Sequence, residues 1–365
     1  MSMTLFIWEV LPLKQQPLQT KPYLLTHSLL PENQETPLSF IDTPFVPNKY
    51  FYRRNHFAYP ALSYSSFWLP IGGFVETPTV FSFQDLIQLP AKTMQVALEC
   101  SGNKRDFFRP KMFGEQWKRG AISQGQWKGV PLQTLLEKAG LKDEAVEVVF
   151  EGYDYGPRTD LDKNYAFMRS LPLEKALHPD TIIAYEYNNK PIPFKHGYPL
   201  RLIVPQWYAV ASVKWIKQIQ VINKPFKGPF QTIDYMYYPY NDDDRDAFPV
   251  TTLNVNSSIQ SPLEYEILNT GEYLIKGIAS TGIGKIMKVE ISTDGGKTWG
   301  SAEMAANDEY GWTSWSYKWS VHDKGEYTIL SKATDSHRRT QSETAFWNRK
   351  GYGYNAIDRI KVKVE

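Results

Sequence analysis

The sequence has almost no cysteine and no long apolar run. Cys100 is the single cysteine among 365 residues, so an intrachain disulfide is excluded and nothing in the sequence requires an oxidising compartment. No stretch approaches the roughly 20 apolar residues that a membrane-spanning helix needs. Residues 1–11 lack the basic start, apolar centre and small-residue cleavage site of a signal peptide. We therefore expect a soluble, cytoplasmic protein with no membrane partner.

An excess of one charge is also absent. The 41 lysines and arginines nearly balance the 39 aspartates and glutamates, so the overall charge gives no reason to expect nucleic acid as a partner. The Gly-x-Gly-x-x-Gly and P-loop motifs of nucleotide sites are missing. The six histidines form neither a His-Glu-x-x-His motif nor a Cys/His cluster, which argues against a structural zinc site. Local basic clusters can still hold a small anion.

Two domains are expected, because the chain is longer than one hydrophobic core usually supports. Residues 1–45 are rich in Pro, Gln, Thr and Leu without a clean period, and we expect an arm that wraps over a domain. Residues 46–245 mix short strands and helices without βαβ regularity, which predicts an α+β fold. Residues 246–365 alternate apolar and polar side chains between turns, which predicts an Ig-like antiparallel β-sandwich.

Several local elements have clear signals. Ser82-Phe83-Gln84-Asp85 resembles a capping box that opens a short helix. A second helix is predicted over 132–139, because Gly140 can close it in the C′ position. In the second half, Asp294-Gly295-Gly296 marks a hairpin turn. Residues 96–98 read as a strand that runs into Cys100, so the sheet would hold this side chain while its tip stays accessible.

The residues around Cys100 leave several roles open for its thiol. A lone buried cysteine is most often simple packing, and a nucleophile paired with His56 or His196 is also conceivable. The third reading is a soft thiolate ligand to a metal. Arginines, lysines and histidines in residues 50–57 and 196–205 suit a phosphorylated cofactor or a small oxyanion. Such a set would hold a metal cofactor that performs redox chemistry.

The segment Cys100-Ser101-Gly102-Asn103-Lys104-Arg105 resembles the C-x-G-N-x-R signature of the sulfite oxidase family of molybdenum enzymes. The resemblance covers about residue 45 to the end, and its motifs follow the family order. In the first half it rests on Arg54-Asn55-His56, His196-Gly197-Tyr198-Pro199-Leu200-Arg201 and Ser212-Val213-Lys214-Trp215. In the second half, Ser292–Trp299 and Trp347-Asn348-Arg349-Lys350-Gly351 are similar to that family's dimerisation domain.

The resemblance implies roles for individual residues. Cys100 would supply a thiolate to molybdenum bound to molybdopterin, with Tyr235 and Arg54 acting beside it in catalysis. Residues that match cofactor-binding positions are Asn55, His56, Cys100, Asp154, His196, Arg201, Ser212 and Lys214. Residues that match the substrate pocket are Arg54, Arg105, Trp117 and Tyr235, with Lys285 in place of an arginine from the second domain. Phe113 stands where the animal enzymes have a pocket lysine.

The activity implied is oxidation of sulfite to sulfate by oxygen-atom transfer. No haem is expected, because a single cysteine excludes the c-type Cys-x-x-Cys-His motif and no haem domain is expected before residue 45. Electrons would therefore pass to a separate acceptor or to oxygen, and the dimerisation domain implies a homodimer. The alternatives are a related enzyme that acts on another oxyanion or an S- or N-oxide, such as nitrate, and a β-sandwich interaction protein without cofactor.

Overall fold

The computed structural model describes residues 23–41, 43–62, 67–306 and 309–365. Residues 1–22 and 42 of the expected arm therefore lie outside the described part. Within residues 23–41, strands β1 (Leu25–Leu29) and β2 (Glu32–Glu35) form an antiparallel hairpin, followed by the short 3₁₀ helix η1 (Leu38–Phe40). The hairpin is attached to the first domain, because Gln34 and Arg53 exchange backbone hydrogen bonds of 2.8 and 2.9 Å.

One five-stranded antiparallel sheet carries the segment that leads to Cys100. Its order is β10-β9-β6-β5. β11 also pairs with β9, at residues 182–184, beside the part of β9 that pairs with β10. Strand β5 ends at Glu99, directly before Cys100, as the sequence predicted. The strands are β5 (Lys92–Glu99), β6 (Ile122–Pro131), β9 (Ile182–Tyr187), β10 (Lys190–Pro191) and β11 (Arg201–Ile203).

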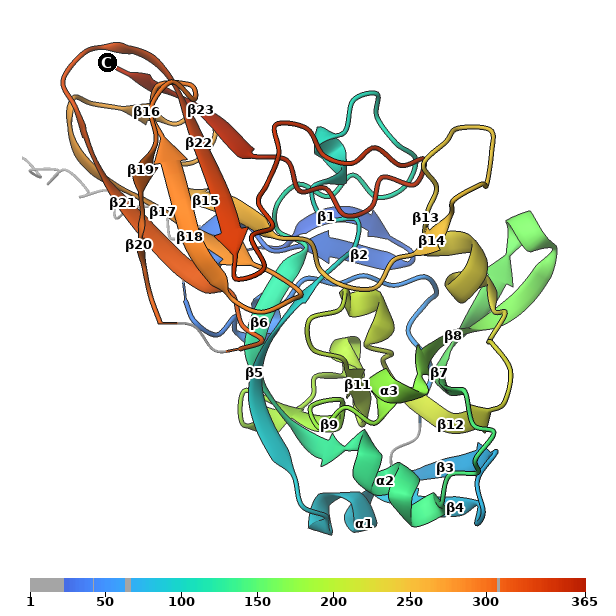
Figure 1. The fold of residues 1–365 in the computed structure, drawn as a ribbon. Coiled ribbons are helices and arrows are strands. Elements are labelled where there is room, and N and C mark those ends of the chain that lie inside the picture. The colour runs from blue at the N-terminus through green and yellow to red at the C-terminus, as the bar shows by residue number, and fades with distance from the viewer. Residues whose placement is uncertain (1–22, 42, 63–66, 307–308) are drawn as a thin grey trace, which may run out of the picture.

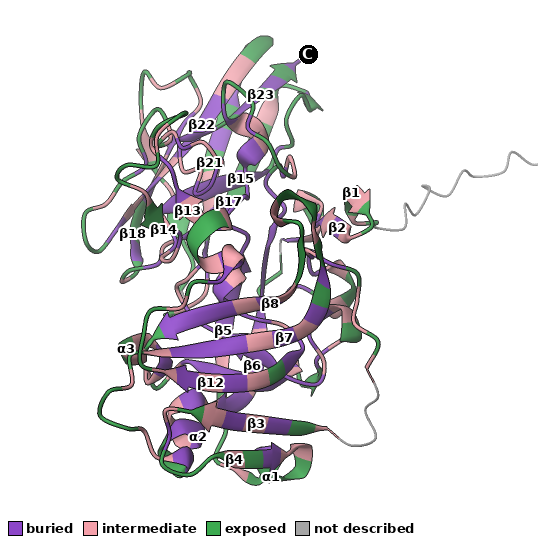
Figure 2. Ribbon diagram, turned by 90° about the vertical axis from the view of Figure 1, so that its right-hand side faces the viewer, coloured by how far each residue is buried: buried purple, intermediate pink, exposed green. Residues whose placement is uncertain are grey.

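A second five-stranded sheet has the order β4-β3-β12-β7-β8. Strands β12 and β3 run parallel, and the other pairs are antiparallel. Figure 2 shows buried residues interspersed with partly or fully exposed ones along β7, β8 and β12. The strands are β3 (Trp68–Gly73), β4 (Thr79–Ser82), β7 (Glu147–Arg158), β8 (Lys163–Pro172) and β12 (Ile216–Ile222).

The α-helices of the described residues are short. Helix α1 (Phe83–Gln88) begins with the predicted capping box of Ser82 and Asp85, and α2 (Leu132–Ala139) ends at Gly140, whose φ is +70°. Helix α3 (Leu173–Ala176) has a single turn. The α+β class is therefore confirmed only in part, since strands dominate. The remaining helical turns are the 3₁₀ helices η2 (Asn48–Tyr50), η3 (Arg105–Phe107), η4 (Thr159–Leu161), η5 (Phe194–His196) and η6 (Ala209–Ala211), and the π-helical turn η7 (Phe230–Asp234).

The main hydrophobic core lies between α2 and the two sheets. Leu135, Val130, Phe150 and Ile219 are completely buried there. A second cluster, with Phe51, Leu98, Trp117 and Trp127, includes the Cys100 side chain. The thiol therefore lies at the edge of a packed core rather than on a surface loop.

The second half forms two facing sheets that bury a common apolar cluster (Figure 1). Trp315, Trp319 and Val321 of one sheet meet Ile360 and Val362 of the other, as the alternation predicted. The first sheet contains β15 (Asn256–Ser261), β17 (Gly271–Ser280), β20 (Glu303–Met304) and β21 (Thr313–Val321). The second contains β16 (Ile267–Leu268), β18 (Ile286–Ser292), β19 (Gly300–Ser301), β22 (Gly325–Asp335) and β23 (Asp358–Val364).

The hairpin predicted at Asp294 is confirmed, because β18 and β19 pair across it. β16 and β23 run parallel, so the sandwich is not purely antiparallel. A small sheet of β13 (Met236–Tyr237) and β14 (Phe248–Pro249) bridges the two halves. Val250, Leu253 and Tyr352 also pack into the core of the first half. The division at residues 245 and 246 stays a prediction. Among the described residues, no helix is long and apolar enough to cross a membrane.

Candidate functional site

Two cavities share one wall, formed by Arg54, His56, Cys100 and Tyr235. We call them the inner and the outer cavity. The inner cavity is further lined by Ser101, His196, Arg201, Ser212 and Lys214 among others, and the outer cavity by Arg105, Phe113, Gly114, Glu115, Asp234, Lys350 and Tyr352. Chain segments more than 250 residues apart therefore meet around the single thiol.

Cys100 is fixed by backbone hydrogen bonds where β5 ends. Its N–H donates to the Ala121 carbonyl at 2.9 Å, and its carbonyl accepts from the Asn103 N–H at 2.8 Å. The residue is 8% exposed. Burial raises the pKa of the thiol above its usual value, and Arg54 and Arg105 oppose part of this shift. The two guanidinium groups would stabilise the thiolate, the form that binds a metal.

Two loops of the first domain supply the far wall of the inner cavity. His196 ends η5, Arg201 begins β11, and Ser212 and Lys214 follow η6. Gly197 has φ +112°, and a Cβ there would lie 3.1 Å from the Lys214 Cα, so the close approach of the loops requires glycine. In the His196-Gly197 motif, the glycine therefore permits the packing of the two loops, while the histidine lines the cavity.

The inner cavity concentrates buried cations. Burial lowers the pKa of Arg201 to about 10. Burial, Arg201 and Lys214 hold the pKa of His196 well below its usual value. The pKa of Lys214 is lowered by burial, while Asp154 opposes this shift. Because like charges lower one another's pKa, a bound anion would stabilise the protonated forms of these groups.

Some predicted cofactor residues act through their neighbours rather than on the cavity wall. Asn55 and Asp154 are buried but do not line either cavity. The Lys214 ammonium donates to the Asn55 Oδ1 and, at 3.0 Å, to the Arg54 carbonyl. Asn55 in turn is held by its side-chain N–H donating to the Glu32 carbonyl at 2.7 Å. These contacts set the position of the Lys214 cation.

Several polar atoms in and beside the inner cavity are buried without a hydrogen-bond partner among the described residues. They include the Arg53 Nε, the Arg201 Nε, the Asp154 Oδ1 and the Ser101 Oγ. Buried polar groups are nearly always paired in folded proteins. The set contains both donors and acceptors beside an excess of cations. It therefore fits a polar, negatively charged ligand such as a phosphorylated cofactor.

In the outer cavity, Arg105 is held by the second half of the chain. Its Nε donates to the carbonyls of Lys350 and Gly351 at 3.1 and 3.2 Å, and its Nη1 donates to the Glu115 carbonyl at 3.0 Å. A Cβ on Gly102 would lie 2.7 Å from the guanidinium. The glycine of the signature therefore leaves room for the arginine three residues later.

Tyr235 lies at the junction of the two cavities, directly after the π-helical turn η7. Its hydroxyl is 2.9 Å from the His56 Nε2, and its ring stacks on Tyr352 with centroids 5.3 Å apart. Burial raises the pKa of Tyr235, which keeps the phenol protonated at neutral pH. The hydroxyl is therefore a hydrogen-bond donor at the place where the cavities meet.

Two predicted substrate-binding residues are not on either cavity wall. Trp117 is completely buried behind the Cys100 loop, where its ring meets His27 at a centroid distance of 4.7 Å. Lys285 is exposed in the turn before β18, and its N–H donates to the Ser336 Oγ at 3.2 Å. Motif order alone placed both residues at the pocket, whereas the packing of the second half presents a different lysine.

The cation missed by the sequence analysis is Lys350. It lines the outer cavity together with Tyr352 and Glu115, none of which was assigned to the site. A signal is present in the sequence, because the segment Trp347–Gly351 resembles the dimerisation domain of the sulfite oxidase family. Its position near Cys100 depends on a tertiary contact that sequence spacing does not reveal.

Comparison with known proteins agrees with this geometry. Residues 56–230 match the family model of the oxidoreductase molybdopterin binding domain, and residues 247–365 match the Mo-co oxidoreductase dimerisation domain. Sulfite oxidase of Gallus gallus is 31% identical over 353 residues, which cover 90% of this chain and 76% of that protein. The chain belongs to the sulfite oxidase family of molybdopterin oxidoreductases.

Two further proteins are similar to this chain over most of its length. Mitochondrial sulfite oxidase of Rattus norvegicus is 31% identical over 365 residues, covering 94% of this chain. The match spans 66% of the length of that protein, just under two thirds. Among solved structures, the sulfane dehydrogenase SoxCD of Paracoccus pantotrophus has a TM-score of 0.82 at 27% identity, covering 99% of this chain and 94% of that chain.

Proposed function

We propose that the protein oxidises sulfite to sulfate with a molybdenum cofactor and passes the electrons to a separate acceptor. The observation that carries this proposal is the junction of the two cavities at Cys100. A single thiol lies between a buried cationic cavity suited to a phosphorylated cofactor and a second cationic cavity suited to a small anion.

The molybdopterin cofactor would be held in the inner cavity. Cys100 would provide the protein thiolate to the metal. His196, Arg201, Ser212 and Lys214 would bind its polar and phosphate groups, a role supported by the unpaired Arg201 Nε. When bound, the cofactor would supply the two-electron redox chemistry and oxygen-atom transfer.

The outer cavity would bind the anionic substrate. Arg54, Arg105 and Lys350 are its cations. Its two carboxylates are engaged elsewhere: Asp234 lies 2.7 Å from Arg158, and Glu115 accepts from Asn33 at 3.0 Å. The charge left facing the cavity is therefore positive, which favours a small dianion such as sulfite.

Beside the thiolate, Tyr235 would donate a proton in a hydrogen bond and Arg54 would stabilise negative charge. Conversion of sulfite and water to sulfate releases two electrons and two protons. The Tyr235 hydroxyl can donate to a substrate oxygen, and His56 can hold or accept a proton at Nε2, 2.9 Å away. Burial lowers the pKa of His56 well below its usual value, so the ring is neutral and able to accept.

Steady-state kinetics would test the proposal. Protein purified from a host that makes the cofactor would be assayed with sulfite and ferricyanide, and with nitrate or a sulfoxide and a reduced viologen dye. We expect the largest kcat/KM with sulfite. A larger kcat/KM with nitrate or a sulfoxide would reject sulfite as the substrate. No turnover with any of these compounds would reject the proposal that the protein is an enzyme of this kind.

A further inference from the structure

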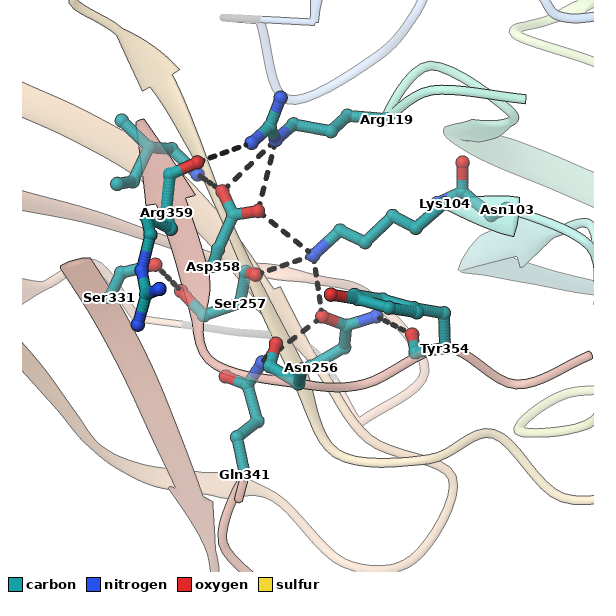
Figure 3. Close-up of polar contacts among 12 residues, drawn as sticks. Asn103, Lys104, Arg119, Asn256, Ser257, Ser331, Gln341, Tyr354, Asp358 and Arg359 are labelled. Carbon is teal, nitrogen blue, oxygen red and sulfur yellow. Dashed lines mark hydrogen bonds and ion pairs between the residues drawn. The ribbon is translucent and has the colours of Figure 1, made fainter. Parts of the chain in front are cut away.

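Lys104 extends from the Cys100 loop into the second half of the chain (Figure 3). Lys104 is completely buried. Its ammonium donates to the Asn256 Oδ1 at 2.7 Å and to the Ser257 carbonyl at 2.8 Å, and it lies 3.7 Å from the Asp358 Oδ1. All three acceptors belong to β15 and β23 of the sandwich.

Asp358 also binds a second cation from the first half. The Arg119 Nε lies 2.9 and 3.2 Å from the two Asp358 oxygens, and its Nη2 donates to the Arg359 carbonyl at 2.8 Å. The Ile259 N–H completes the set at 2.9 Å from the Asp358 Oδ2. We call Lys104, Arg119 and Asp358 the buried charge cluster.

Removing the charged groups of the buried charge cluster from water costs free energy, and the contacts among these groups offset part of that cost. Burial lowers the pKa of Lys104 and Asp358 opposes the shift, while Arg119 and Lys104 hold the pKa of Asp358 below its usual value. Removing one member would leave a buried charge with too few partners. An apolar contact could join the two halves at lower cost, so the cluster is better explained by a need for fixed geometry.

The backbone at Lys104 supports this explanation. Lys104 has φ +64°, in the left-handed region that lysine rarely adopts, and its N–H donates to the Lys118 carbonyl at 2.6 Å. Cys100, Ser101 and Arg105 of the same loop line the cavities. A second link joins the loop to the sandwich, since the Gly353 N–H donates to the Ser101 carbonyl at 2.8 Å.

We propose that Lys104 and Asp358 are positioning residues, which hold the loop of residues 100–105 against the sandwich so that Cys100 and Arg105 face the two cavities. The sandwich then has a direct role in the site of the first half. The kinetic part of the test below rests on the proposed function, but the chemical part does not.

The chemical test uses the single thiol as a probe of the loop. The 365-residue chain, purified from a host that cannot make the cofactor, would be treated with a thiol reagent. Lys104→Met and Asp358→Asn should raise the modification rate of Cys100 by roughly tenfold, because the loop opens more often. The control is Arg339→Met, which removes a cation from another sandwich carboxylate, Asp335, 2.8 Å away.

Low concentrations of urea would separate loop opening from general instability. Opening of the loop exposes little surface, so the faster rates should stay flat in low urea, whereas global unfolding would make them rise steeply. Rates of both variants equal to those of the wild type, or an equal rise in Arg339→Met, would overturn the proposal. So would a steep dependence on urea.

The kinetic test asks whether Arg105 is misplaced when the buried charge cluster is broken. In enzyme loaded with cofactor, Asp358→Asn should raise the sulfite KM by roughly tenfold, with a smaller change in kcat per molybdenum. Arg339→Met should leave both unchanged. If sulfite is not turned over at all, the proposed function fails, and the thiol rates still decide the role of Lys104 and Asp358. An unchanged KM in an enzyme that does turn over sulfite would overturn the positioning of Arg105.

Discussion

At the scale of single residues, the outer cavity separates two lysines, of which only Lys285 was assigned to the substrate pocket from the sequence. Lys285 and Lys350 both come from the second half, and both follow family motifs. Only Lys350 lines the outer cavity, because the segment 348–353 turns back toward Arg105. Which of two lysines reaches a cavity is decided by tertiary packing, and a single sequence does not encode that in its spacing.

We therefore predict different effects for the two lysines. Lys350→Met should raise the sulfite KM by roughly tenfold, because one of three cations at the substrate is lost. Lys285→Met serves as the matched control and should leave KM unchanged. Steady-state sulfite oxidation measures both, and the opposite ranking would place the substrate outside the cavity described above.

His196 gives a pH-dependent prediction. Burial and the cations Arg201 and Lys214 keep its pKa well below the usual 6.5, so the folded chain binds fewer protons than the unfolded chain below that pH. The stability that this group contributes is complete above about pH 6.5 and is lost as the pH falls. In the cofactor-free chain, His196→Gln should therefore lose about 1.4 kcal/mol less than the wild type between pH 7.5 and 5.5. Urea unfolding at each pH would measure this, and parallel curves would contradict it.

At the scale of elements, Tyr235 depends on a clamp between a hairpin and a π-helical turn. Arg158, at the end of β7, lies 2.7 Å from Asp234, the last residue of η7, and its guanidinium stacks over the Phe230 ring at 5.3 Å. π-Helical turns are rare and concentrate at functional sites. The clamp therefore fixes the backbone from which the Tyr235 side chain reaches the cavities beside Cys100.

Breaking this clamp should reduce catalysis more than stability. Arg158→Met is expected to lower kcat/KM for sulfite by roughly tenfold, because Tyr235 loses its fixed position and Asp234 faces the cavity without its partner. The control is Lys217→Met, which removes a surface cation 2.7 Å from Glu151 in the same sheet. Equal activity of the two variants would show that η7 does not need the clamp.

Local signals predicted the elements better than their arrangement. The capping box at Ser82 and the terminal glycine of α2 act within one helical turn, and both helices were found at the expected residues. The parallel pairing of β12 with β3 joins segments about 150 residues apart and has no local signal. The α+β expectation overstated the helices for the same reason, since strand pairing extends elements that look short in sequence.

At the scale of the whole molecule, the motif residues His196, Arg201, Ser212 and Lys214 meet Cys100 at the inner cavity, while the contribution of the second half to the outer cavity was underestimated. Lys350 and Tyr352 line that cavity, and Val250 and Leu253 pack in the core of the first half. Segments of the second half therefore contribute to the wall of the outer cavity and to the core of the first half. The cytoplasmic location stays a prediction.

We also propose that the protein is a homodimer. The second half matches a family model described as a dimerisation domain. Size-exclusion chromatography with light scattering should give twice the chain mass at micromolar concentration. A mass equal to one chain would contradict this prediction without affecting the assignment of the cavities, because the wall residues assigned above all belong to the same chain.

The central claim is that sulfite delivers two electrons to a metal held by Cys100. The most direct test is anaerobic titration of the purified, molybdenum-loaded protein with sulfite, followed by the absorbance of the metal centre. We predict complete reduction at one sulfite per molybdenum, with one sulfate formed, and no change with Cys100→Ser. Absence of reduction by sulfite in the wild type, or full reduction in Cys100→Ser, would contradict the account.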